Sequence, residues 1–328
     1  NLDIYGEEID GYGLVNNFEG VGLSGSAVII DNVKILSGTK IKKSGFLGGN
    51  ITTNPFAGNS AGFEATIRNC TIEKGVTIGY DKDERMIGSF AGRMQGTIEN
   101  CVSEADVYGT DYVGGIIGTR DNAMGACIVK NCRFSGTVTG TGRNTGGIAG
   151  GGYENSTAPN GGKITVISCS SDGTVNGNIN VGGIIGGDEF VAQSWGPYTF
   201  AGNSFNGKVT GKENVGAIIG FYASLSKFDN IAGNFFTKNC GAKDGVGTVK
   251  YVDTNAKTTT KKEGTLYFNT EKGISDCPTV QGCNWRSAHN RTDDPLGADK
   301  EKLARAVDTI PTDAFCYELV LKSGPPKT

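Results

Sequence analysis

Short apolar runs alternate with polar and glycine residues through the first 250 residues, and their order repeats every 31 to 37 residues. Each repeat contains a phrase like Ile-Arg-Asn-Cys at 67–70, Ile-Glu-Asn-Cys at 98–101 or Val-Lys-Asn-Cys at 129–132. The phrase closes at seven positions: Val33, Cys70, Cys101, Cys132, Cys169, Asn203 and Asn234. Self-similarity at such a period predicts a solenoid, in which every repeat forms one coil.

Each repeat holds three short runs rich in Val, Ile, Thr and Phe, separated by glycine or asparagine, and no helical apolar spacing occurs in residues 1–250. This pattern predicts an all-β fold, a right-handed parallel β-helix solenoid of about seven coils with three strands per turn. Like residues should then stack as interior ladders. One ladder would be Ile116, Ile148, Ile184 and Ile218, and another would run from Cys70 to Cys169.

A glycine-framed apolar box closes most repeats: VGGIIG at 113–118 and 181–186, TGGIAG at 145–150 and VGAIIG at 215–220. Its paired glycines suit a sharp corner, where a Cβ would clash. The distance from the ladder position to the last box glycine is steady, whereas the gaps to the next ladder position run 9, 14, 19, 17 and 14 residues. Insertions confined to one place predict loops on one edge, where solenoids often bind ligands.

Those loops carry aromatic and polar side chains that suit sugar stacking or anchoring of a protein partner. The candidate ligand-binding residues are Arg120, Tyr153, Phe190, Trp195, Tyr198 and Tyr222. The structural alternative is that these aromatic rings fold back and cover the sheet.

The repeat fades after about residue 250, so residues 1–250 are predicted to form the β-helix domain and residues 251–328 a C-terminal capping region. Within that region we expect one amphipathic helix. Asp294 would cap its start, Leu303, Ala306, Val307 and Ile310 would form its apolar face, and Pro311 would end it. Such a helix would cover the open strand edge of the last coil.

Composition narrows the range of partners. The formal net charge of −3 gives no basic surface for a phosphate backbone, which argues against nucleic acid. No apolar run approaches the ~20 residues that span a bilayer, and residue 1 does not begin a signal peptide, so we expect a mature or excised fragment that does not span a membrane.

Four of the nine cysteines share the ladder position that Val33 also fills, which favours buried thiols over disulfides. Stacked cysteines are nevertheless close enough for bridges within the ladder, so that alternative stays open. Cys277 and Cys283 are the best candidate disulfide outside the ladder, in a secreted protein.

The combination of an Asn-Cys turn, a Gly-Thr-Val strand such as 136–138, and the VGGIIG box resembles the GLUG repeat of bacterial cell-surface proteins, which include adhesins and some IgA-cleaving metallopeptidases. The match extends from about Ile30 to Asn234. The resemblance implies a secreted or surface-displayed parallel β-helix and no single activity. The metallopeptidase motif HExxH is absent, so no catalytic residue carries over.

Candidate catalytic chemistry is sparse. His289, the one histidine, lies in a polar stretch outside the repeats, and no paired Cys or His spacing suits zinc, so neither a metal nor a cofactor is expected. The run Asp81 to Glu84 lacks the spacing of a calcium loop. Two carboxylates suffice for glycoside cleavage, and Asp188, Glu189 and Glu154 are the candidates if the protein is an enzyme.

The sequence therefore favours a non-enzymatic extracellular surface protein, an adhesin or binding stalk whose loop edge contacts a host or environmental glycan or a surface protein. One alternative is a carbohydrate-active enzyme, a glycoside hydrolase or lyase built on a β-helix. Another is a structural subunit that self-associates end to end into an extracellular fibre, for which an uncovered first coil near residues 1–30 would be the telling feature.

Overall fold

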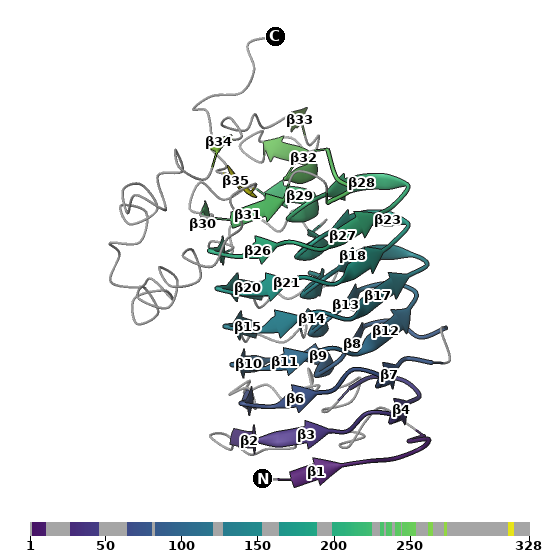
Figure 1. Cartoon of the computed structure of the whole chain (residues 1–328). Coiled ribbons are helices and arrows are strands. Elements are labelled where there is room, and N and C mark those ends of the chain that lie inside the picture. Colours follow the sequence, from purple (N-terminus) through teal and green to yellow (C-terminus); the bar gives the residue numbers. More distant parts are fainter. Residues whose placement is uncertain are drawn as a thin grey trace, which may run out of the picture.

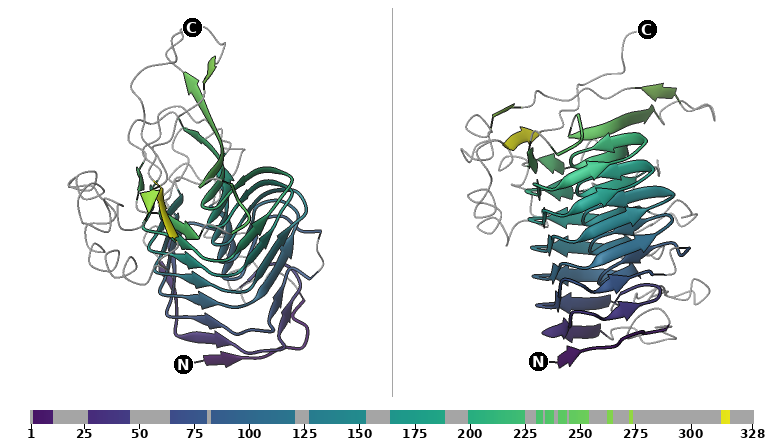
Figure 2. Two further views of the ribbon diagram at one scale, coloured as in Figure 1. Left: turned by 45° about the horizontal axis from the view of Figure 1, so that its top comes forward. Right: turned by 45° about the vertical axis from the view of Figure 1, so that its right-hand side comes forward.

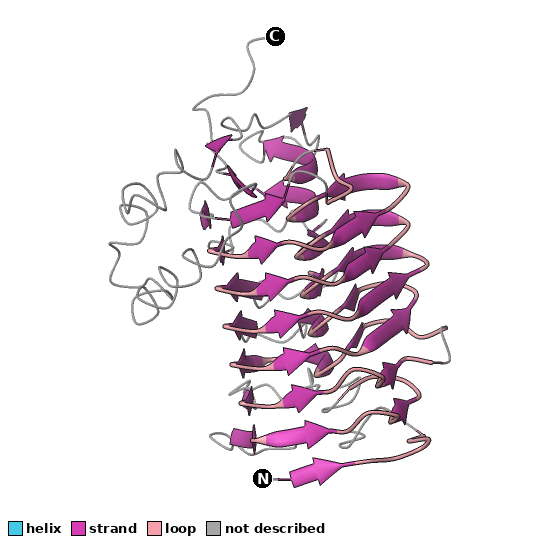
Figure 3. Cartoon of the chain, in the orientation of Figure 1, coloured by secondary structure: helices cyan, strands magenta, loops and turns pink. Residues whose placement is uncertain are grey.

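The computed structural model describes residues 2–10, 27–45, 64–80, 83–120, 127–152, 164–188, 199–224, 230–232, 234–237, 240–243, 245–253, 262–264, 272–273 and 314–317. These residues form a parallel β-solenoid, and every regular element among them is a strand (Figure 3). The turns stack directly on one another, with the first strands at one end and the last at the other (Figures 1 and 2). The all-β solenoid predicted from the repeat is confirmed.

Each complete turn visits five sheets, which we number I to V in chain order. The turn at residues 96–120 shows the order clearly, with one strand in each sheet: β10 (Gly96–Glu99), β11 (Val102–Ser103), β12 (Asp106–Gly109), β13 (Val113–Gly114) and β14 (Ile117–Arg120). Each strand pairs in parallel with its equivalents in the turns before and after it, for example Ile98 with Ile67 and Val129.

The other complete turns repeat this order. They are formed by β5 (Glu64–Arg68), β6 (Thr71–Ile72), β7 (Thr77–Ile78), β8 (Ile87–Gly88) and β9 (Ala91–Met94); β15 (Cys127–Lys130), β16 (Arg133–Phe134), β17 (Thr137–Gly140), β18 (Arg143–Gly146) and β19 (Ala149–Gly151); β20 (Ile164–Ile167), β21 (Ser170–Ser171), β22 (Thr174–Asn176), β23 (Ile179–Gly182) and β24 (Ile185–Asp188); and β25 (Thr199–Ala201), β26 (Ser204–Phe205), β27 (Lys208–Thr210), β28 (Glu213–Gly216) and β29 (Ile219–Ser224).

Partial turns flank these five complete ones. At the start lie β1 (Leu2–Ile4), β2 (Ala27–Asp31), β3 (Val33–Ile35) and β4 (Lys40–Ile41), and at the finish lie β30 (Asn230–Ala232), β31 (Asn234–Thr237) and β32 (Val246–Asp253). The described residues thus contain five complete turns, and the count of seven coils stays a prediction. The expectation of three strands per turn is wrong, because two of the apolar runs bend in the middle.

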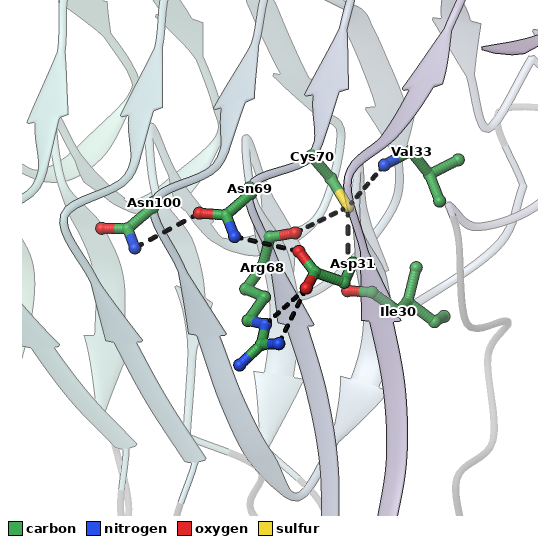
Figure 4. Close-up of polar contacts among 7 residues, drawn as sticks. All are labelled: Ile30, Asp31, Val33, Arg68, Asn69, Cys70 and Asn100. Atoms are coloured by element: carbon green, nitrogen blue, oxygen red, sulfur yellow. Dashed lines mark hydrogen bonds and ion pairs between the residues drawn. The ribbon is translucent and has the colours of Figure 1, made fainter. Parts of the chain in front are cut away.

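The first bend lies at the asparagine of the repeated phrase, between sheets I and II. Asn69, Asn100 and Asn131 have φ of 56°, 54° and 53°, in the left-handed region that asparagine tolerates better than other side-chain-bearing residues. Their side chains form an exposed ladder, in which the Nδ2 of Asn100 donates to the Oδ1 of Asn69 at 3.5 Å (Figure 4). One residue per turn therefore redirects the chain without ending its pairing.

The second bend lies in the glycine box, between sheets IV and V. A Cβ on Gly183 would overlap the carbonyl oxygen of Ala217 in the next turn and the ring of Phe205. The box thus brings successive backbones together at a distance that only glycine permits, which confirms the predicted corner.

The interior is filled by the predicted ladders. Ile116, Ile148, Ile184 and Ile218 are all buried, and the amide of Ile116 donates to the carbonyl of Ile148 at 2.9 Å. Cys70, Cys101, Cys132 and Cys169 are also buried, and these four, like Cys127 and Cys240, form no disulfide bond. This confirms the ladder and excludes bridges within it, whereas Cys277 and Cys283 lie outside the described residues.

The last turn is covered by antiparallel strands. β35 (Ala314–Tyr317) pairs antiparallel with β31 at the edge of sheet II and also with β34 (Lys272–Gly273), and β33 (Lys262–Gly264) pairs antiparallel with β32 at the edge of sheet V. The predicted helix over 294–310 lies outside the described residues. The C-terminal region thus contributes short strands to the edges of sheets II and V, and its role as a capping region stays a prediction.

Candidate functional site: the loop edge

All long interruptions of the complete turns except one leave the solenoid at the same corner, between the end of sheet V and the start of sheet I. Here the chain passes through one residue after β9, and through residues 121–126, 152–163, 189–198 and 225–229 after β14, β19, β24 and β29. The exception, after β7, precedes β8. We call the corner after sheet V the loop edge. It agrees with the edge expected from the variable gaps in the sequence.

The corners on either side are tight. In the turn at 96–120 the chain needs two residues between sheets I and II, two between II and III, three between III and IV and two between IV and V. Hydrogen bonds between turns hold this frame: the Thr119 hydroxyl at the end of sheet V donates to the carbonyl of Gly151 in the next turn at 2.7 Å. The loop edge therefore has a rigid base.

Three of the sequence-predicted residues lie on this base, at equivalent register positions of sheet V. Arg120 pairs with Met94, and Asp188 pairs with Tyr222. Because neighbouring strands are about 4.8 Å apart, Asp188 and Tyr222 have adjacent backbones, and Arg120 lies two turns before Asp188. The structure thus brings these three positions into one column.

Tyr222 corrects one expectation. We expected its ring to be exposed on a loop, but β29 continues past the glycine box and carries Tyr222 inward, where its side chain is 1% exposed within the core. For this residue the alternative, an aromatic that packs on the sheet, is the one observed. Tyr153, Glu154, Glu189, Phe190, Trp195 and Tyr198 lie outside the described residues.

The described residues hold no group of three or more His, Cys, Asp or Glu side chains that could bind a metal ion. Glu84, from the acidic run considered for calcium, forms an ion pair with Lys43 at 2.6 Å, while Asp81 and Lys82 lie outside the described part. The same part of the chain contains no helix long and apolar enough to cross a membrane.

The outer face of sheet I carries a column of alternating charge beside the asparagine ladder. Asp31, Arg68, Glu99 and Lys130 are register partners in successive turns. Arg68 binds Asp31 through Nε at 2.9 Å and its terminal nitrogen at 2.7 Å (Figure 4). Lys130 binds Glu99 at 3.0 Å. Hydrogen bonds from Arg68 and then Asn69 lower the pKa of Asp31. These charges hold the turns in register.

The buried thiols of the cysteine ladder are poor nucleophiles. A hydrogen bond to Cys101 and then burial raise the pKa of Cys70, and a hydrogen bond to Cys132 is the largest cause that raises the pKa of Cys101. Burial raises the pKa of Cys132. In Cys70, Cys101 and Cys132 the thiol, rather than the nucleophilic thiolate, is therefore the form present at neutral pH.

The sequence analysis considered the first coil, near residues 1–30, only as a fibre contact, and it did not predict exposed apolar side chains at this N-terminal end of the solenoid. The three exposed large apolar side chains of the described residues, Leu2, Tyr5 and Ile29, all lie there. The sequence feature that sets this end apart is the charge of its first segment, because no Lys or Arg occurs before Lys34.

Comparison of the chain with protein-family models, curated proteins and solved structures gives no match. The fold therefore defines the class, a parallel β-solenoid with a one-sided loop edge, and membership of the GLUG family stays a prediction.

Proposed function

We propose that this protein is a non-enzymatic extracellular binding protein, an adhesin or binding stalk, which contacts glycan or protein ligands through its loop edge. The observation that carries the proposal is the confinement of the long loops after β14, β19, β24 and β29 to one corner. A rigid scaffold that presents variable loops side by side is a common design for binding sites. The resemblance to the GLUG repeat supports a bacterial surface location.

The described cysteines do not support nucleophilic catalysis. They are buried and form no disulfide bond, and their pKa values are raised where a shift is resolved, so they offer no nucleophile. A fibre built head to tail is disfavoured because antiparallel strands occupy the edges of sheets II and V at the C-terminal end.

The first experiment is a screen of the purified chain on glycan and host-matrix arrays, together with a Trp195→Ala/Tyr198→Ala variant. We expect binding that the double substitution abolishes. Trp285→Ala is the matched control, because Trp285 is the second tryptophan of the chain and lies outside the repeats. Equal binding by all three proteins would contradict a role for these loop aromatics.

A second variant tests the edge itself. Replacing residues 189–198 by a single Gln copies the connection through Gln95 that joins β9 to β10. We expect unchanged circular dichroism and lost ligand binding, because the scaffold already accepts the short connection in another turn. Every array hit should also be assayed for cleavage. Turnover that Asp188→Asn abolishes would replace this proposal with the carbohydrate-active enzyme.

A further inference from the structure

The cysteine ladder places four thiols in a row along the axis of the solenoid. Backbone hydrogen bonds continue between turns at this position: the amide of Val102 donates to the carbonyl of Cys70 at 3.0 Å, and the same bond recurs in the next two turns. Neighbouring cysteines are therefore separated by about 4.8 Å, the spacing of strands in a sheet. Each follows the left-handed residue of the first bend, and Asn69 and Asn100 are exposed, so the buried row lies directly beneath the surface.

The four side chains have the same orientation. The thiol of Cys70 lies 3.1 Å from the carbonyl oxygen of Arg68 in its own turn and 3.8 Å from that of Ile30 in the turn before (Figure 4). Equivalent contacts position the next three thiols, at 3.2, 3.3 and 3.3 Å within the turn and at 3.8, 3.6 and 3.6 Å to the turn before. The sulfur atoms therefore repeat at the spacing of the backbone.

Backbone amides point at these sulfur atoms. The amide of Val33 donates to the Sγ of Cys70 at 3.4 Å. The backbone of Cys70 forms the equivalent bond to Cys101, and that of Cys101 forms it to Cys132. Such N–H donors stabilise negative charge on a sulfur that binds a metal ion. The ladder is thus equipped to hold deprotonated sulfur once a metal cation takes the place of the proton.

The spacing of the row suits an ion that takes two ligands in a line. A metal–sulfur bond is about 2.3 Å long, so a linear sulfur–metal–sulfur unit spans about 4.6 Å, close to the spacing of about 4.8 Å between turns. A tetrahedral ion such as Zn²⁺ needs more ligands around one point, and the described residues hold no group of three or more. Thiolate sulfur selects the soft ion Cu⁺, which accepts linear coordination by two sulfurs.

We propose that the cysteine ladder binds Cu⁺, with one ion between Cys70 and Cys101 and a second between Cys132 and Cys169. Each ion forms two metal–sulfur bonds and displaces two S–H protons to solvent, and no group is oxidised or reduced. The resulting unit has one net negative charge, toward which the amide donors point. The ligands of each pair are 31 and 37 residues apart, so the close spacings of a metal motif could not indicate this site.

The test uses the full chain in reduced form. Cys277, Cys283 and Cys316 are replaced by serine in every protein, so that only the cysteines of the solenoid interior remain. Silver ion is the probe, because Ag⁺ has the charge and softness of Cu⁺ and is stable in air. We expect native mass spectrometry to detect two silver ions per chain and no retained Zn²⁺. Absence of bound silver would overturn the proposal.

Two double variants separate the pairing of thiols from their number, because each removes two cysteines. Cys70→Val/Cys101→Val keeps the neighbours Cys132 and Cys169 and should bind one silver ion. Cys101→Val/Cys132→Val keeps two cysteines that have no neighbour and should bind none. Both should fold, as circular dichroism can show, because Val33 fills this position in the first turn. Equal numbers of bound ions in the two variants would mean that thiols bind silver singly, against the proposal.

Cys127 provides a control for burial. It is buried like the ladder cysteines, but its register partners are Gly96 and Ile164, so it has no thiol in the turn before or after. Cys127→Ala should therefore still bind two silver ions. Loss of an ion in this variant would assign the binding to buried thiols in general and would also overturn the proposed site.

Discussion

A single residue position shows how the interior of this solenoid accommodates different side chains. Cys169 donates its thiol to the carbonyl of Val129 at 3.6 Å, and its equivalent one turn later, Asn203, donates its amide to the carbonyl of Val166 at 2.9 Å. Asn203 also accepts the backbone amide of Cys169 at 3.0 Å. Thiol and amide thus fill the same site because each donates to the turn before.

This equivalence predicts the effect of two substitutions. Cys169→Asn should change the free energy of unfolding by less than about 1 kcal/mol, because the new amide finds the donors and acceptors that Asn203 uses. Cys169→Asp should cost about 3–5 kcal/mol, since it buries a carboxylate that has no cation beside it. Chemical denaturation of both variants measures the difference, and equal losses would contradict the ladder argument.

The close backbone contact at the glycine box predicts the effect of adding a single methyl group. Gly183→Ala should lower the free energy of unfolding by about 3 kcal/mol or more, because the new methyl group meets backbone and an aromatic ring that cannot move aside. In Gly6→Ala, the control, the methyl group would meet only outer atoms of the flexible Ile9 side chain, so this substitution should cost less than about 1 kcal/mol. Thermal melting of the two variants compares them.

At the scale of elements, the register of sheet I is supported by ion pairs on its outer face as well as by the packing of its buried side chains. The Arg68 guanidinium favours the ionised form of Asp31 in the folded state and so lowers the pKa of that carboxyl. The stabilisation is present above the unfolded pKa, about 4, and is lost as the pH falls through the lower folded pKa. The pair is half exposed, so its effect on stability is small.

The titration of Asp31 itself is the sensitive measurement. Arg68→Gln should raise its midpoint toward the ordinary value, as followed by NMR of the carboxyl carbon. Lys130→Gln breaks the next ion pair along the same column, with Glu99, and should leave the Asp31 midpoint in place. An unchanged midpoint in Arg68→Gln would mean that hydrogen bonding from Asn69 alone holds the carboxylate.

The elements also show what the sequence could predict. Period, interior ladders, box corner and loop edge all follow from spacing, because a solenoid converts sequence repetition directly into stacking. The number of strands did not follow, since a left-handed Asn69 bends the chain within one apolar run and leaves no gap in the pattern. Tyr222 was misplaced for a related reason: sequence shows where a box ends but not how far its strand continues.

Across the whole molecule, the two ends of sheet II differ in how their strand edges are satisfied. β1 lacks an outer partner in the described part, whereas β31 is paired with β35, and β33 likewise pairs with β32 at the last edge of sheet V. Sheet I has no outer partner in the described part at either of its end strands, β2 and β30. Nothing in the repeat predicted this difference, because it depends on segments outside the repeat that fold back over the last turn. Only the missing Lys and Arg before Lys34 distinguished the first turn.

Hydrogen exchange should report this difference along the axis. Amides of β10, β15 and β20, which have partners on both sides, should exchange most slowly, and those of β1 and β2 fastest, because a terminal turn opens without disturbing the rest. Mass spectrometry of peptic fragments resolves the turns. Uniform exchange from end to end would indicate that the solenoid opens only as a whole.

The equal length of successive repeats has a genetic consequence. Cys70, Cys101 and Cys132 are spaced by 31 residues, and the three turns that contain them pair residue for residue in sheet I. A duplication of 31 codons in this region therefore inserts one complete turn in frame and in register, which lengthens the stack by about 4.8 Å. A duplication or deletion of this length changes the length of the protein, and its number of edge loops, in a single step.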